Sequence, residues 1–80
     1  MHKFNIGDLF YVYRTRALYY IDTVDELTSI REQYSEYRMH LMNTSAAAIQ
    51  NMYVTSNVID SMLKRKSWIW YPVIKDSNDQ

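Results

Sequence analysis

Catalysis by a protein nucleophile needs a serine, threonine or cysteine beside a base that a third group orients. This sequence has no cysteine and two histidines, and none of its serines lies in a sharp glycine turn. His40 occupies a polar position between alternating apolar residues, which is typical of a solvated strand histidine, and His2 lies at the very start. The sequence therefore predicts a protein without an assembled active site, and not an enzyme.

Three neighbouring carboxylates are the best candidates for a metal site. Asp22, Asp25 and Glu26 could together hold a hard cation weakly. The same residue types are typical of a solvated turn, which is the interpretation we favour. A glycine-rich phosphate loop is excluded because the chain has a single glycine. We therefore expect neither a metal ion nor a cofactor.

Aromatic residues are the most informative group in this sequence. Eight tyrosines, two tryptophans and two phenylalanines belong to an apolar fraction of 48%. A barrel of this size encloses roughly 20 side chains, because about half of each strand points inward. The surplus must lie at the surface or at an interface, where tyrosine and tryptophan are favoured. The alternative is that a helix and a long loop cover the second face of the strands.

The surplus rings predict a contact patch for a partner protein or for a second copy of the chain. The candidate residues are the aromatic residues of the first, second and last predicted strands, with arginines at the border: Tyr11, Tyr13, Tyr19, Tyr20, Trp68, Trp70, Tyr71, Arg14, Arg16 and Arg38. For the arginines, the plainer interpretation is that they are solvated residues at strand ends.

A basic run close to two tryptophans supports an alternative hypothesis. Lys64, Arg65 and Lys66 precede Trp68 and Trp70, and this combination can hold phosphates and stack on bases. A charge cluster that complements the dipole at a helix end is the plainer interpretation. Nine basic and nine acidic residues balance to no net charge, which argues against a general nucleic-acid binder. Weak nucleic-acid binding therefore remains the alternative.

The elements that position these residues are predicted to be mainly strands. Residues 4–14 and 17–24 are rich in aromatic and β-branched residues and predict a hairpin, with a turn or bulge at Gly7 and Asp8. The polar residues 25–33 predict a longer link. Residues 34–43 follow as a third strand, because apolar and polar positions alternate with one wet face.

The second half of the sequence allows two arrangements. Apolar spacing permits a single helix over residues 45–66, but four poor helix formers at 54–57 favour a break. We therefore expect a fourth strand at 49–55 and a short helix at 57–66, with Asn57 as its cap and Asp60 completing a capping box. A last strand at 67–74 should end or lie at an edge near its proline, before a flexible tail at 75–80.

This order of elements, with a helix before the last strand, carries a family resemblance. The opening Phe4-x-Ile6-Gly7-Asp8-x-Phe10 resembles small SH3-like barrels. The closing blocks Tyr53-x-Thr55-Ser56-x-Val58-Ile59-Asp60 and Trp68-x-x-Tyr71-Pro72-Val73 resemble small SH3-like proteins of tailed bacteriophages, including those that infect cyanobacteria. The resemblance covers about residues 3–74 and implies a five-stranded barrel with one short helix and a viral origin. The paired acidic and tryptophan segment of eukaryotic SH3 domains is missing, so it does not imply proline-rich ligands.

Length and composition complete these expectations. Eighty residues without cysteine predict one domain over 1–80, with an ordered core at about 3–74 and no disulfide scaffold. Neither a signal-peptide run nor a membrane span is predicted, and we expect the protein in the cytoplasm, which is that of the host if a phage encodes it. The function we expect is non-catalytic docking on a protein, with nucleic-acid binding or a role in the virion or its assembly as alternatives.

Overall fold

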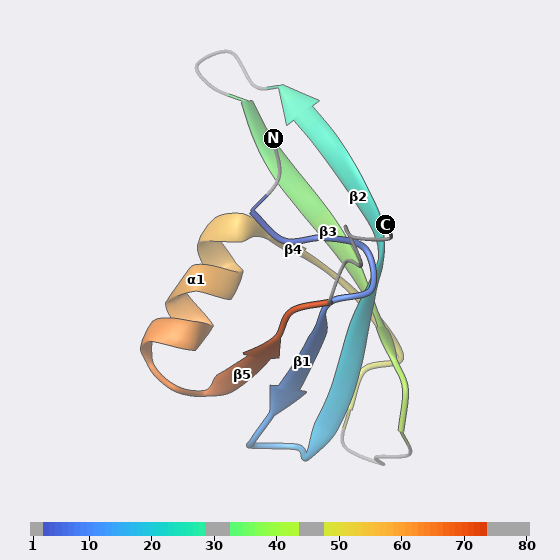
Figure 1. Ribbon diagram of the computed structural model, residues 1–80, viewed down its shortest axis with the longest axis vertical. Coiled ribbons are helices and arrows are strands. Elements are labelled where there is room, and N and C mark those ends of the chain that lie inside the picture. Colours follow the sequence, from blue (N-terminus) through green and yellow to red (C-terminus); the bar gives the residue numbers. More distant parts are fainter. Residues whose placement is uncertain (1–2, 29–32, 44–47, 74–80) are drawn as a thin grey trace, which may run out of the picture.

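The computed structural model describes residues 3–28, 33–43 and 48–73 (Figure 1). The tail predicted at 75–80 lies outside these residues. Five strands and one helix follow one another along the chain: β1 (Leu9–Val12), β2 (Ala17–Thr28), β3 (Gln33–Leu41), β4 (Asn51–Thr55), α1 (Ser56–Lys64) and β5 (Trp68–Tyr71). A mainly β fold with one short helix before the last strand is therefore confirmed.

The strands form a single antiparallel sheet in the order β4-β3-β2-β1-β5. β4 and β5 are its two edges, and no pairing joins them within the described ranges, so the sheet is open rather than closed into a barrel. α1 leads from one edge strand to the other and contacts β3, β4 and β5. Figure 1 shows α1 on one side of the curved sheet, beside β5. The helix thus covers the inner face of the sheet where the strands do not meet.

Two predicted boundaries in the first half were wrong. The first strand spans only Leu9–Val12, because Gly7 has a φ of 98° and the residues before Asp8 form the expected turn. The polar stretch predicted as a link instead extends β2 to Thr28, paired with β3 as far as Gln33. Backbone pairing within this hairpin needs no buried side chain, so a polar composition does not prevent a strand there. The register between β2 and β3 shifts between Ile21 and Thr23.

The break in the second half is confirmed, and the continuous helix over 45–66 is wrong. The strand β4 ends at Thr55 and α1 begins at the next residue. The predicted cap is also wrong, because Asn57 lies inside the helix and Thr55 is the N-cap, without a side-chain hydrogen bond. Asp60 binds the ammonium group of Lys3 at 2.7 Å instead of completing a capping box. Ile59 on α1 is fully buried against the sheet.

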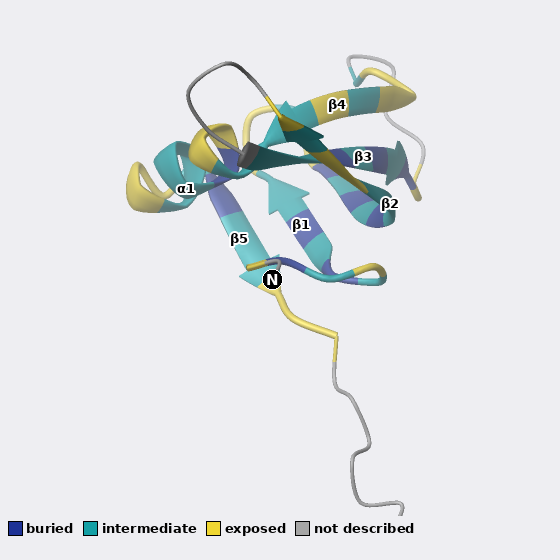
Figure 2. Ribbon diagram, turned by 90° about the horizontal axis from the view of Figure 1, so that it is seen from above, coloured by how far each residue is buried: buried dark blue, intermediate teal, exposed yellow. Residues whose placement is uncertain are grey.

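The core lies between the inner face of the sheet, α1 and the segment that precedes β1. Its buried hydrophobic residues are Phe4, Phe10, Ala17, Tyr19, Ile21, Tyr37, Met39, Leu41, Ile59 and Trp68. Figure 2 shows these buried positions alternating with more exposed ones along β1, β2 and β3. The ring of Phe4 lies edge-to-face against Phe10, Tyr37 and Trp70, with centroids 4.9–5.6 Å apart. Large rings therefore fill the interior of a chain too short for many core residues.

A buried carboxylate joins the start of the chain to β5. Asp8 is fully buried, and its carboxylate accepts hydrogen bonds from the indole nitrogen of Trp70 at 2.9 Å and from the backbone nitrogen of Val73 at 2.8 Å. The backbone nitrogen of Asn5 donates a third, at 3.1 Å. Glycine is favoured beside it, because Gly7 has a φ of 98° and a Cβ there would also lie 3.3 Å from Val73 Cγ2. The Gly7-Asp8 pair therefore has a structural role.

Candidate functional site

The strand register divides the predicted contact residues between two faces. Across β1 and β5, Phe10 pairs with Trp70 and Tyr11 pairs with Ile69. Because paired residues point to the same side and neighbours along a strand to opposite sides, one set faces the core and the other faces outward. Phe10, Val12, Trp68 and Trp70 belong to the core set and its partly buried rim. The outward set is a candidate binding surface.

We call this surface the outer face. Its residues are the outward apolar side chains of β1, β2 and β5, together with the tyrosine that follows β1: Leu9, Tyr11, Tyr13, Leu18, Tyr20, Ile69 and Tyr71. Tyr13 and Tyr71 are 53% and 49% exposed, and the other five are half-buried. The rings of Tyr11 and Tyr13 meet edge-to-face at 5.4 Å. Seven apolar side chains thus adjoin one another on the solvent side of the sheet.

Three of the predicted contact residues are core residues instead. Tyr19 is 3% exposed and its hydroxyl donates to the backbone oxygen of Ile49 at 2.8 Å. Burial raises the pKa of the Tyr19 phenol, opposed by that hydrogen bond. Trp68 is 8% exposed, and Trp70 packs on Phe4 and donates to Asp8. The number of aromatic residues in the sequence does not show which of them face the core. Only the strand register assigns each residue to one side of the sheet.

The predicted border arginines occupy two places. Arg14 and Arg16 are exposed in the turn between β1 and β2, where Arg16 has a positive φ of 59°. Asn43 holds this turn, because its amide donates to the Arg16 backbone oxygen at 2.9 Å and its side-chain oxygen accepts from the Leu18 backbone at 3.0 Å. The two arginines therefore lie at one end of the outer face.

Arg38 lies farther across the sheet and is engaged. Its guanidinium binds Asp22 through two hydrogen bonds of 2.8 and 3.0 Å, and it also interacts with Tyr53. The hydrogen bond from Arg38 lowers the pKa of the Asp22 carboxyl, and Asp22 in turn raises the pKa of Arg38. The outer side of β3 and β4 is therefore polar, in contrast to the apolar outer face on β1, β2 and β5.

The remaining candidates for chemistry do not form a reactive group. Asp22 is occupied by Arg38, and Asp25 pairs across the strands with Glu36. No group of three or more possible metal ligands occurs among the described residues. His40 Nδ1 lies 2.6 Å from the Asn51 side-chain oxygen. Each is a contact between neighbouring strands.

The basic run of the alternative hypothesis is exposed at the end of α1. Lys64, Arg65 and Lys66 all face solvent. Trp68 and Trp70, the rings expected to stack on bases beside them, point into the core and cannot take that role. The residue Tyr13, which follows β1 and is 53% exposed, adjoins this run through its backbone: its nitrogen donates to the oxygen of Ser67 at 3.1 Å.

Some residues of the outer face did not stand out in the sequence. Leu9, Leu18 and Ile69 carry no unusual chemistry, and they belong to the surface only because they alternate with the core positions. The alternation along each strand could have identified them: once Phe10 is assigned to the core, its neighbours along the strand must face outward.

The fold alone assigns this protein to a class: a small open antiparallel sheet with one covering helix. No family model matches the chain, and no curated protein or solved structure shows significant similarity to it. Within the described residues, α1 is too short and too polar to cross a membrane.

Proposed function

We propose that this protein is a non-catalytic interaction module that docks on a partner protein through the outer face. The observation that carries the proposal is the division of aromatic residues between two sides of one sheet. The inner side already has a complete ring cluster around Phe4 and Phe10, so the outer rings are not needed to fill the core. None of the described contacts within the monomer explains why these outer rings are exposed to solvent.

The composition of the outer face suits protein binding. Tyrosine combines a broad apolar ring with a hydroxyl, and such residues dominate the affinity of many interfaces. Arg14 and Arg16 border the surface at the turn and supply charge at its rim. The partner is a host or viral protein or a second copy of the chain.

We also propose that the open sheet is a variant of the SH3-like barrel, of the kind found in small proteins of tailed bacteriophages. The strand order supports this, because the last strand pairs with the first while the helix leads from β4 to β5. The long β2, with its register shift after Ile21, pairs with β1 over residues 17–20 and with β3 from Tyr19 to Thr28. The site of action would then be the cytoplasm of the host cell.

The proposal is tested by serine substitutions on the outer face. The double variant Leu9→Ser/Tyr71→Ser should remain folded by circular dichroism, because neither residue is buried. Sedimentation equilibrium and affinity capture from the native cell then measure self-association and partner binding. We expect the wild type to bind and the double variant to lose most of that binding.

Tyr53→Ser is the matched control. Tyr53 is a tyrosine 60% exposed, but it lies on β4, away from the outer face. This variant should bind as well as the wild type. The proposal is wrong if the wild type stays monomeric and the double variant captures the same proteins as the control in equal amounts.

A further inference from the structure

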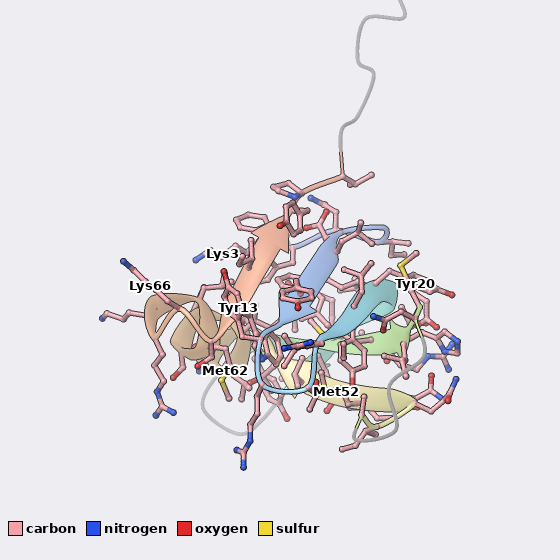
Figure 3. All side chains as sticks on the ribbon, turned by 90° about the horizontal axis from the view of Figure 1, so that it is seen from below. Lys3, Tyr13, Tyr20, Met52, Met62 and Lys66 are labelled. Carbon is pink, nitrogen blue, oxygen red and sulfur yellow. The ribbon has the colours of Figure 1, made fainter. Side chains whose placement is uncertain are left out.

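Two segments far apart in the sequence lie together at one end of the molecule. The turn between β1 and β2 contains Arg14 and Arg16, and the connection from α1 to β5 contains Lys66. Val12 pairs with Trp68, and the backbone hydrogen bond from Tyr13 to Ser67 extends that pairing to the edge of both segments. Figure 3 looks at this end and labels Tyr13 and Lys66.

We call the cations of this end the basic pole: Arg14, Arg16, Lys64, Arg65 and Lys66. All five are exposed, and within the described ranges none of their charged groups forms an ion pair or a hydrogen bond. Such a concentration of unneutralised positive charge creates a local potential that attracts anions.

The described acidic residues lie elsewhere. Asp8 is buried at the opposite end of β1, and Asp60 binds Lys3. Asp25, Glu26 and Glu36 lie on the far part of the β2–β3 hairpin, which Figure 1 shows at the opposite end of the molecule from the β1–β2 turn. Among the described residues, most carboxylates therefore lie away from the basic pole or are paired with other cations.

A helix dipole does not explain the basic pole. Lys64 lies in the last turn of α1, where a cation is favourable, but Arg14 and Arg16 belong to another element. The helix ends in a Schellman arrangement, in which Lys66 and Ser67 donate to the oxygens of Leu63 and Met62 at 3.0 and 2.9 Å. Lys66 holds the left-handed position that usually belongs to glycine, with φ of 62°. Both left-handed non-glycine residues in the described ranges, Arg16 and Lys66, thus carry positive charge at this pole.

An exposed aromatic ring adjoins these cations. Tyr13 directly precedes Arg14, is 53% exposed and is braced edge-to-face by Tyr11. Single-stranded nucleic acids are bound by this combination, in which cations hold the phosphates and a ring stacks on an unpaired base. An acidic protein segment or an anionic membrane would use the cations but has no base to place on the ring.

We propose that the basic pole and Tyr13 bind single-stranded nucleic acid. The phosphates lie along the five cations, and one base stacks on the ring of Tyr13. Duplexes bind more weakly, because their bases are already stacked and the ring cannot reach them. This site overlaps the proposed docking surface at Tyr13 and at its rim, but its cations Lys64, Arg65 and Lys66 lie outside the outer face.

Fluorescence anisotropy with labelled oligonucleotides of about 12 residues tests the proposal, because sites of this kind cover about 4–16 nucleotides. The probes are oligouridylate, oligothymidylate and a mixed-sequence duplex at low salt. We expect both single strands to bind more tightly than the duplex. Three to five phosphate contacts predict a slope of log K against log salt of about −2 to −3.5. Binding of only the RNA or only the DNA probe would support the proposal and identify the sugar that is preferred.

Charge-reversal variants locate the site. Arg65→Glu should weaken binding by about tenfold or more at low salt. Lys3→Glu is the comparison, because it makes the same charge change at an exposed cation that is outside the pole and already paired with Asp60, and it should weaken binding less than Arg65→Glu. Tyr13→Leu keeps an apolar side chain and should weaken binding by about fivefold or more without changing the salt slope.

Several results would overturn the proposal. These are no binding of either single strand at low salt, equal losses in Arg65→Glu and Lys3→Glu, or no loss in Tyr13→Leu. Tighter binding to heparin or to vesicles of phosphatidylcholine and phosphatidylglycerol than to the oligonucleotides would also overturn it and assign the pole to another polyanion. Leu9→Ser/Tyr71→Ser should bind the oligonucleotides normally, so a failure of this proposal is distinguishable from a failure of the docking proposal.

Discussion

The indole nitrogen of Trp70 donates a 2.9 Å hydrogen bond to the buried carboxylate of Asp8. This bond connects the turn before β1 to the last strand, which are 62 residues apart in the chain. It also fixes which face of β5 is inward, because Trp70 can reach Asp8 only from the core side. The outward positions of Ile69 and Tyr71, and therefore part of the outer face, depend on it.

Replacing Asp8 should destabilise the whole fold. Asp8→Ala leaves the Trp70 indole and the backbone nitrogens of Asn5 and Val73 without their acceptor. We expect a loss of about 3 kcal/mol or more in the free energy of unfolding, measured by urea denaturation. Asp60→Asn removes an exposed ion pair with Lys3 and should cost no more than about 1 kcal/mol. Equal losses in the two variants would contradict this role of Asp8.

Gly7 should not tolerate a side chain. Gly7→Ala meets both an unfavourable φ of 98° and a contact of 3.3 Å with Val73 Cγ2. We expect a loss of about 1–2 kcal/mol in the free energy of unfolding. The neighbouring Ile6→Ala, at a position 61% exposed, should change that free energy by less than about 0.5 kcal/mol. A Gly7→Ala protein as stable as the wild type would show that this turn can relax.

Lys66 should show opposite effects on stability and on binding. Lys66→Gly relieves a left-handed backbone with φ of 62° and should raise the free energy of unfolding by about 1 kcal/mol. The same change removes a cation from the basic pole and should weaken oligonucleotide binding. Lys66→Ala removes the charge but retains a Cβ, so it should weaken binding without the gain in stability. Thermal melts and anisotropy titrations of the two variants check this prediction.

The ion pair between Asp22 and Arg38 should make stability depend on acid pH. The pKa of Asp22 is lowered in the folded state, so the folded protein releases this proton more readily than the unfolded chain. Its contribution is complete above the unfolded aspartate pKa of about 3.9 and is lost as the pH falls through the lower folded pKa. The stability difference between wild type and Asp22→Asn should therefore be constant near neutral pH and shrink below about pH 4.

A second background provides the control for this pH dependence. Arg38→Gln removes the partner that is the main cause of the lowered Asp22 pKa. In that background, Asp22→Asn should have a much smaller pH-dependent effect, as measured by urea unfolding across the acid range. An unchanged pH profile would show that another group causes the acid dependence.

Several features of the fold followed from local patterns. The alternation around Tyr37 and Met39 identified β3 and its buried side, because a strand with one wet face has a period of two. The poor helix formers at 54–57 correctly predicted a break between β4 and α1, although Ser56 and Asn57 belong to the helix. The extension of β2 to Thr28 was not visible, because its polar residues are stabilised by pairing with β3 rather than by burial.

The sequence by itself determined that the chain is mainly β, that one short helix precedes the last strand, and that aromatic residues are abundant. These properties depend on residue type and on neighbours along the chain. Only the tertiary structure decided that Tyr19, Trp68 and Trp70 are core residues, and that Arg14 and Arg16 lie beside the basic end of α1. The reason is that strand register sets which side each residue faces, and it depends on pairing between segments that are distant in sequence.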